Sequence, residues 1–379
     1  MIELRGITWD HPRGFAPLLA SVEPYAAQTG IRVVWEKRSL KEFGDTPVDK
    51  LAAEYDLLII DHPHVGIAAA TRSLLPLDTC IPADVVALLA EQSAGPSHAS
   101  YFYLGHQWAL AIDAAMQTSS YRSDLLGGSL PGSWEEVIEL AESLEGSGRW
   151  IGTTLVPTDC ACYFLTLCAS LGDPPGQRDE LVSKNTGTRA LELISQLSRL
   201  SHPDSLSWNP IKLLDHMSRE DDVVYCPLTF NYSNYARDGY AKHTVRFGNI
   251  PGVKGSILGG TGFAVSASCQ HQEAACAYGT WLCSAETQRG FYLKNGGQPG
   301  NVVAWEDPQV NRLTANFFLD TIDTLQHAYL RPRYHGFVDF QVGAGDIIHQ
   351  MLSDGLDVDG CLGQLFDLYA ETRAAEEAW

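Results

Sequence analysis

The tripeptide Asp-His-Pro occurs twice near the start of this chain, at residues 10–12 and 61–63, each time after an apolar run and shortly before a glycine. An imidazole can act as a polar contact or as a general acid or base near neutral pH, and a carboxylate accepts hydrogen bonds. Two interpretations compete. The two copies are either similar loop segments that end strands, or two halves of one binding site.

The first copy lies within "ITWDHPRG". On the functional interpretation Trp9 offers a stacking surface, Asp10 and His11 offer hydrogen bonds, and Arg13 at a helix start can meet a carboxylate or phosphate. On the structural interpretation Asp10 caps the helix and Pro12 occupies its first turn. The two interpretations do not exclude each other.

The second copy lies within "IIDHPHVG" and adds Asp61, His62 and His64. Their spacing matches no recognised zinc signature, so the sequence predicts neutral imidazoles as ligand contacts or acid–base groups rather than metal ligands. His106 is a further candidate, because it stands where the chain is expected to cross between two lobes. We expect no metal site and no cofactor.

The other candidates lie further along the chain. "PTDCACYF" places Asp159 and Cys160 at a helix start, where a thiol pKa falls, so Cys160 is either a nucleophile or a small packing residue. Aromatic and amide groups at the end of a later strand suit sugars or other flat polar molecules, and glycines allow close backbone approach. These last candidates are Tyr225, Asn231, Tyr232, Gly259, Gly260 and Thr261.

Alternating elements must position these residues. Residues 2–9, 31–37 and 56–61 have strand character, and residues 14–30, 47–55 and 66–75 have helical character. Such alternation predicts parallel strands with right-handed crossovers. If the strand order is 2-1-3, the two Asp-His-Pro loops face each other across the crevice at the carboxyl ends of the strands.

The rest of the chain continues in the same style. Residues 107–126 read as an extended crossing followed by a helix start, and residues 131–148 as a helix capped by Ser133. Residues 221–230 and 254–268 read as strands. Residues 157–164, 188–201 and 272–297 read as helical, and the part from Asn311 onwards as mostly helical.

The composition narrows the class of protein. The chain has 379 residues, a formal charge of −20 and 45% hydrophobic residues. That charge opposes nucleic acid and anionic membranes, and no apolar run approaches the roughly 20 residues of a membrane helix. Nine cysteines and an N-terminus without signal-peptide character predict a cytoplasmic, reducing compartment, or a periplasmic one if a signal was removed.

Five segments follow one another along the chain in a recognisable order. They are "PGSWEEVIELAESL", "DDVVYCPLTFNYSNYA", "GSILGGTGFAVSASCQHQEAACAYGTWLCSAETQ", "YLKNGGQPGN" and "YLRPRYHGF". In this order the segments resemble the extracellular solute-binding proteins of family 1, the ligand receptors of ABC importers. The resemblance implies the type II periplasmic-binding-protein fold, an α/β fold in which two lobes, each a mixed, mainly parallel sheet flanked by helices, enclose a ligand cleft. The absent signal and the nine cysteines depart from the family's pattern.

Two functional hypotheses follow. The first is hinge closure around a small polar organic ligand, sugar-like or another polar metabolite, with an ABC importer as partner if the protein is exported. The alternative is a cytosolic enzyme of lyase, isomerase or hydrolase type that uses His11, His62 and His64 as acid and base and Cys160 as a nucleophile. We expect the first lobe at residues 1–108 and 258–310, the second at 109–257, and a helical segment at 311–379.

Overall fold

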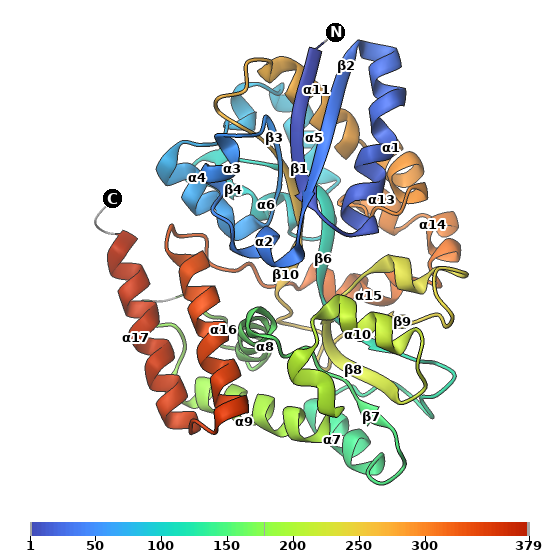
Figure 1. The fold of residues 1–379 in the computed structure, drawn as a ribbon, viewed down its shortest axis with the longest axis vertical. Helices are drawn as coiled ribbons and strands as arrows, with labels where there is room; N and C mark the ends of the chain where they lie inside the picture. Colours follow the sequence, from blue (N-terminus) through green and yellow to red (C-terminus); the bar gives the residue numbers. More distant parts are fainter. Residues whose placement is uncertain (1, 178, 377–379) are drawn as a thin grey trace.

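The computed structural model describes residues 2–177 and 179–376, which fold into two lobes joined through one path of hydrogen-bonded strands (Figure 1). The order along this path is β2-β1-β3-β10-β6-β8-β7, and β9 pairs with β6. The strands are β1 (Ile2–Trp9), β2 (Ile31–Arg38), β3 (Leu57–Ile60), β6 (Leu110–Tyr121), β7 (Trp150–Ile151), β8 (Val223–Phe230), β9 (Arg246–Gly248) and β10 (Leu258–Val265).

The first lobe is built on β2, β1, β3 and the adjoining part of β10. Strand β1 runs parallel to both β2 and β3, which confirms the predicted parallel pairing, and the strand order is 2-1-3. Every residue of β3 is buried, as its uninterrupted apolar sequence requires for a strand covered on both faces. Strand β10 then adds to β3 in the antiparallel direction.

Helices and turns cover this first sheet. They are α1 (Pro12–Thr29), α2 (Leu40–Asp45), α3 (Val48–Ala52), η1 (His62–His64), α4 (Val65–Thr71), η2 (Leu77–Thr79), α5 (Ala83–Glu91), α6 (Ser97–Ser100) and α11 (Gln272–Cys283). Helix α1 ends at Gly30, whose φ of 73° is the left-handed conformation that glycine adopts without strain. Strands β4 (Phe102–Tyr103) and β5 (His106–Gln107) form a separate small hairpin.

The second lobe is built on the far half of β6 together with β8, β9 and β7. Strand β6 pairs antiparallel with β8 and β9, while β7 runs parallel to β8. Its helices are α7 (Trp134–Ser143), α8 (Pro157–Ser170), α9 (Lys184–Leu200) and α10 (Pro210–Met217), with turns η3 (Pro203–Ser207) and η4 (Ser233–Ala236). Ser133 accepts a hydrogen bond from the Glu136 backbone N–H, so the predicted cap of α7 is confirmed.

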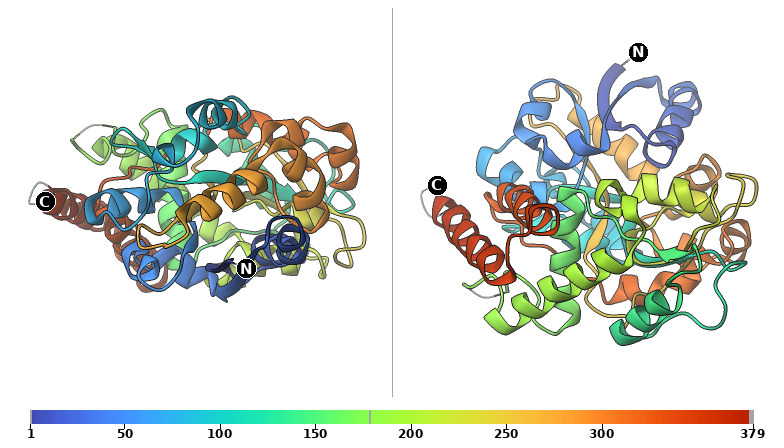
Figure 2. Two further views of the ribbon diagram at one scale, coloured as in Figure 1. Left: turned by 90° about the horizontal axis from the view of Figure 1, so that it is seen from above. Right: turned by 60° about the horizontal axis from the view of Figure 1, so that its bottom comes forward.

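Two long strands connect the lobes, because β6 and β10 pair with each other over residues 110–116 and 258–263. The remaining elements are α12 (Ala285–Thr287), η5 (Gln288–Tyr292), α13 (Val302–Trp305), α14 (Pro308–Leu313), α15 (Phe317–Gln326), α16 (Phe337–Asp354) and α17 (Val358–Glu376). Helices α16 and α17 lie along one side of the second lobe (red in Figures 1 and 2), where α16 packs on α8.

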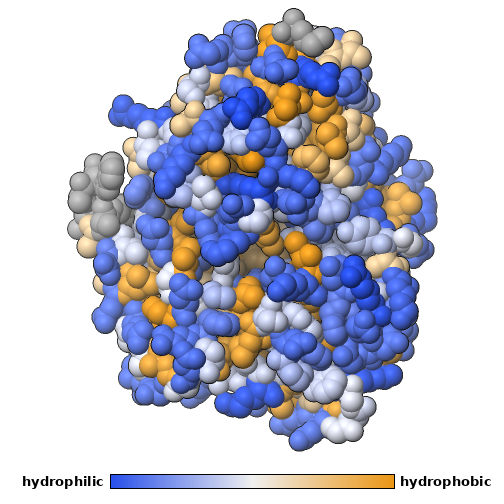
Figure 3. All heavy atoms as spheres, viewed as in Figure 1, coloured by the Kyte–Doolittle hydropathy of each residue, from blue (hydrophilic) through white to orange (hydrophobic). Residues whose placement is uncertain are grey.

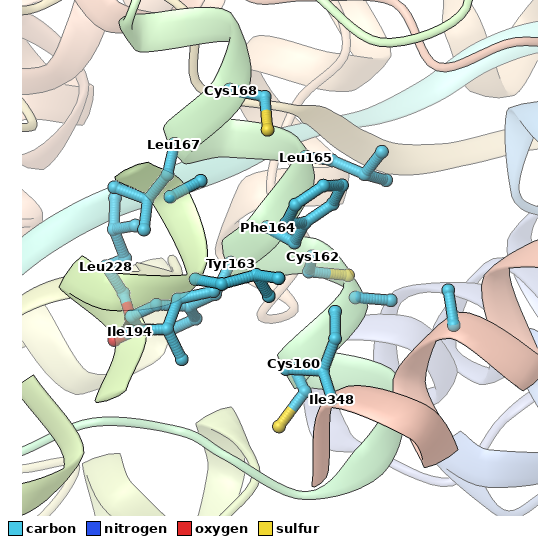
Figure 4. Packing of buried hydrophobic residues seen from close by; sticks show 14 of the residues in the cluster. Cys160, Cys162, Tyr163, Phe164, Leu165, Leu167, Cys168, Ile194, Leu228 and Ile348 are labelled. Carbon is cyan, nitrogen blue, oxygen red and sulfur yellow. Dashed lines mark hydrogen bonds between the residues drawn. The ribbon is translucent and has the colours of Figure 1, made fainter. Parts of the chain in front are cut away.

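Helix α8 is the buried centre of the second lobe. Its residues Tyr163, Phe164 and Leu167 are at most 1% exposed and pack with Ile194 of α9 and Ile348 of α16 (Figure 4). This packing explains why the long apolar stretch at residues 160–168 forms a helix surrounded by other helices. In the part of the chain that the structure describes, no helix is long and apolar enough to cross a membrane.

Candidate functional site

A cleft of about 400 Å³ lies between the two lobes, at the carboxyl ends of β1 and β3. Figure 3 shows the surface hollowed near the middle of one face, with hydrophobic residues at the edge of the hollow. Its volume falls within the range of about 300–1,000 Å³ that is typical of small-molecule sites.

Both lobes and both connecting strands line this cleft. The first lobe contributes Trp9, Arg13, Leu40, Lys41, Phe43, Gly44, Asp45 and Asp61, and β6 and β10 contribute Ala115, Gly259, Gly260 and Thr261. The second lobe contributes Val156, Pro157, Thr158, Asp159, Cys162, Asn209, Pro210, Phe230 and Tyr232. The C-terminal segment contributes Arg331, Gln341, Val342 and Asp346.

An ion pair between Asp61, whose side chain is 18% exposed, and the buried Arg331 forms one wall. Arg331 Nη2 donates to both carboxylate oxygens of Asp61, at 2.7 and 2.6 Å, and Nη1 donates to Gln341 Oε1 at 2.9 Å. Burial alone would raise the pKa of the Asp61 carboxyl, but the Arg331 charge and hydrogen bonds outweigh burial and hold this pKa well below its usual range. The ion pair therefore links the first lobe to the C-terminal segment, and both of its side chains are charged.

A second buried ion pair links Arg13 of α1 to Asp113 of β6. Arg13 Nε donates to Asp113 Oδ2 at 2.8 Å, and Arg13 Nη1 donates to the Asn231 carbonyl at 2.6 Å. The guanidinium carbon also lies 4.6 Å from the centroid of the Tyr232 ring, a cation–π contact. One arginine thus joins the first lobe, a connecting strand and the loop after β8.

Asp159 differs from these paired charges. It lies in the first turn of α8, lines the cleft and is 5% exposed. No described residue forms a hydrogen bond or an ion pair with its carboxyl group, and burial raises the pKa of this group well above its usual range. A buried carboxyl without a partner costs free energy, which a ligand with hydroxyl or amine donors can recover.

Aromatic rings supply much of the apolar lining. Trp9 and Phe43 lie with ring centroids 5.3 Å apart at an angle of 43°, and Phe230 and Tyr232 line the opposite side. A mostly apolar cleft with a few placed polar groups is the usual composition of a site for small organic molecules.

The glycines of β10 bring backbone to the cleft. Gly260 has a φ of 89°, and a Cβ there would collide with the Asp113 carbonyl oxygen of β6. Glycine is therefore required at this position. A side chain on Gly259 would likewise meet the Phe230 ring.

The structure brings together part of the site predicted from the sequence. The predicted residues that line the cleft are Trp9, Arg13, Asp61, Asp159, Tyr232, Gly259, Gly260 and Thr261. The predicted residues that lie outside its lining are Asp10, His11, His62, His64, His106, Cys160, Tyr225 and Asn231.

The histidines of the two loops are structural. His11, not Asp10, caps α1, because His11 Nδ1 accepts the backbone N–H of Arg13 at 3.0 Å. His62 is fully buried, and His64 Nε2 donates to the Gly44 carbonyl at 3.2 Å and so supports α2. Burial lowers the pKa of His11 to about 3 and those of His62 and His64 to about 4, so our expectation of acid–base groups near neutral pH is wrong.

Four other residues lie away from their expected places. Asp10 is exposed and forms an ion pair with Lys37 at 2.7 Å. His106 belongs to the β4–β5 hairpin, where its ring nitrogen lies 3.0 Å from Asp78, and not to the crossing between lobes. Tyr225 is wholly buried in the second-lobe core, and the Asn231 side chain is buried against Gln298 and Met116.

Cys160 is not an activated nucleophile. The side chain is fully buried beside Ile348 (Figure 4), and the thiol donates to the Leu155 carbonyl at 3.2 Å. Burial raises the pKa of this thiol well above its usual range, which overrides the effect of the nearby helix start. The expected lowering of the thiol pKa is therefore wrong.

Sequence reasoning missed α2, the start of α10 and the C-terminal wall of the cleft. Lys41 and Asp45 pair with each other on α2, and Arg331, Gln341 and Asp346 reach the cleft from about 270 residues beyond Asp61. The available signal for Arg331 was its segment "YLRPRYHGF", which the resemblance had already marked.

This geometry, two α/β lobes linked by crossing strands around one cleft, defines the type II periplasmic-binding-protein fold. The solved structures agree along the whole chain. Maltose-bound MalE3 of T. maritima has a TM-score of 0.82 at 18% identity, covering 99% of this chain and 100% of that one. A solute-binding protein of Thermotoga lettingae bound with α-D-tagatose has a TM-score of 0.83 at 14% identity, covering 98% and 100%.

The family follows from the sequence comparison. The model of the bacterial extracellular solute-binding proteins matches residues 20–317, so the chain belongs to this family and is a solute-binding protein. A curated relative, the probable amino-acid ABC transporter periplasmic-binding protein y4oP of Sinorhizobium fredii, is 22% identical over 196 residues. That match covers 49% of this chain and 44% of the relative, so it spans less than half of the relative's length.

Proposed function

We propose that this protein binds a neutral polyhydroxylated solute, a sugar or polyol, in the interlobe cleft and passes it to an ABC importer. The observation that carries the proposal is the unpaired, buried Asp159 carboxyl in a cleft walled by aromatic rings. Hydroxyl groups of a sugar can donate to this carboxyl while the apolar faces of the ring lie against Trp9 or Phe230.

The charges of the cleft favour a neutral ligand over an amino acid. An amino acid needs a cation for its carboxylate, but each lining arginine and lysine among the described residues already has a carboxylate partner. The pairs are Arg13 with Asp113, Lys41 with Asp45, and Arg331 with Asp61. The ligands bound in similar solved structures support the same class. They are maltose, α-D-tagatose and, in a solute-binding protein of Agrobacterium radiobacter, ribitol.

We propose hinge closure as the mechanism, with β6 and β10 as the connection that bends. The closing bodies in this proposal are residues 1–108 with 258–310 and residues 109–257, the latter carrying the segment 311–379. The packing of α16 on α8 supports grouping the C-terminal helices with the second lobe. Small-angle scattering should then give a smaller radius of gyration at saturating ligand, and an unchanged radius would contradict closure.

A thermal-shift panel tests the ligand class. We expect neutral sugars and polyols, with maltose, tagatose and ribitol as probes, to raise the melting temperature, because a ligand that binds only the folded state stabilises it. Amino acids should leave it unchanged. Stabilisation by amino acids and by no sugar or polyol would overturn the proposal. The compartment remains a separate prediction, which thiol titration tests.

A further inference from the structure

We propose that His202, His216 and Asp222 form a binding site for a divalent transition-metal ion, Zn²⁺ being the probe, on the second lobe and outside the solute cleft. No metal site is predicted from the sequence, and none of these residues is among the candidates named there. Each residue offers one ligand atom, and these atoms all lie within 4.8 Å of one another. Two imidazoles and one carboxylate suit Zn²⁺ and similar borderline ions.

The donor atoms already converge. His216 Nε2 lies 2.7 Å from Asp222 Oδ1, and His202 Nε2 lies 3.3 Å from Asp222 Oδ2. Ligands about 2.0 Å from a tetrahedral Zn²⁺ stand roughly 3.3 Å apart. Small side-chain rotations therefore bring the three donors around one ion, and the fourth position is left for water.

Three separate elements hold the donors in place. His202 precedes η3 and its backbone N–H donates to the Ile151 carbonyl at 2.9 Å. His216 lies in the last turn of α10, and the Asp222 carbonyl accepts from Trp150 N–H at 2.8 Å, directly before β8. An ion at this point would tie η3, α10 and β8 together.

Aromatic walls fix the imidazole planes while solvent still reaches the donors. The His202 ring stacks on Trp208, with centroids 4.6 Å apart at 16°, and meets Trp150 edge-on at 5.2 Å. The side chains of His202, His216 and Asp222 are 11%, 22% and 31% exposed, so an ion can enter from outside.

Binding requires both imidazoles to give up the proton on Nε2. Without metal, His216 Nε2 donates to Asp222 Oδ1 at 2.7 Å, so this proton moves to Nδ1 when His216 Nε2 binds the ion. Without metal, His202 Nδ1 accepts the backbone N–H of Asp204 at 3.1 Å, which places the ring proton of a neutral His202 on Nε2. When Nε2 binds the ion, this proton moves to Nδ1 and the capping hydrogen bond is given up. The metal bond replaces it.

Calorimetric titration of the untagged full-length protein with Zn²⁺ tests the site. The parent should bind one equivalent, and His216→Gln and Asp222→Asn should each weaken this binding at least about tenfold. His327→Gln is the matched control, because His327 is an exposed histidine at the end of α15, and it should bind as the parent does. X-ray absorption at the zinc edge should show imidazole ligands in the parent.

Two results would overturn the proposal: no binding by the parent up to millimolar Zn²⁺, or unchanged binding by a folded His216→Gln protein. Circular dichroism establishes whether each variant is folded. If Asp222→Asn does not fold, the comparison of His216→Gln with His327→Gln decides, because the His216 side chain is 22% exposed and lies in the last turn of a helix.

Discussion

Removing the charge of Asp61 should destabilise the protein strongly, and Asp61→Asn isolates that charge. Asp61 also accepts the backbone N–H of His62 at 2.8 Å, and asparagine serves this capping role about as well as aspartate. What the variant loses is the partner of Arg331, whose side chain is 2% exposed. Breaking a buried ion pair by removing one partner costs about 3–5 kcal/mol.

The pH dependence follows from the same pair. The folded-state pKa of Asp61 lies below that of the unfolded chain, so its contribution is complete above the ordinary aspartate range near 3.8 and is lost as pH falls below it. Urea unfolding followed by circular dichroism should therefore show a gap of about 3–5 kcal/mol between parent and Asp61→Asn at pH 7. The gap should narrow toward pH 3.

The control is Asp359→Asn, which removes one partner of the exposed pair Lys184–Asp359. Both side chains there are about three-quarters exposed, and such pairs contribute only about 0–1 kcal/mol. If Asp61→Asn costs no more than this control, the Asp61–Arg331 pair does not stabilise the cleft and the argument fails.

Three further predictions concern groups that the fold has buried. NMR signals of His11, His62 and His64 should not titrate between pH 5.5 and 8, and titration near pH 6.5 would contradict their burial. The free energy of unfolding should fall as pH drops below about 6.5, because these imidazoles bind protons more readily in the unfolded chain. Thiol titration of the protein unfolded without reductant should find nine thiols, and a count lower by two or more would show that the chain is not fully reduced. In the native protein only Cys80 should be labelled fast, since the other cysteines are buried. Gly260→Ala should lower the free energy of unfolding by about 1–3 kcal/mol or more in urea titrations, and a neutral result would show that the backbone there relaxes.

The parallel strands and one side of the cleft could be predicted from local sequence. The apolar runs before Trp9 and Asp61 mark two parallel strands, and a 2-1-3 order places their carboxyl ends together. Trp9, Arg13 and Asp61 accordingly line the cleft.

Side-chain direction within a loop could not be predicted in the same way. The segment His62–His64 forms a 3-10 turn, which directs both imidazoles into the protein rather than toward the cleft. The same limit applies to Cys160, since a helix start indicates a lowered thiol pKa only where the thiol faces solvent.

The residues that line the cleft from the C-terminal segment could not be predicted either. Arg331 and Asp346 lie far along the chain from Asp61, and no local pattern states which helix face meets another lobe. The ion pair of Arg331 with Asp61 is a tertiary contact that only the folded chain reveals.

Calorimetric titration of the parent and of Asp159→Ala with a sugar or polyol that stabilises the parent tests whether the solute binds at Asp159. Removing an unpaired buried carboxyl should leave stability unchanged or raise it, while the affinity should fall by about 1–3 kcal/mol, the usual cost of leaving a buried hydroxyl group without its hydrogen-bond partner. Asp84→Ala, which removes an exposed carboxylate of α5, should bind as the parent does. Equal affinity in all three proteins would show that the solute does not bind at Asp159, and the account of the cleft would be wrong.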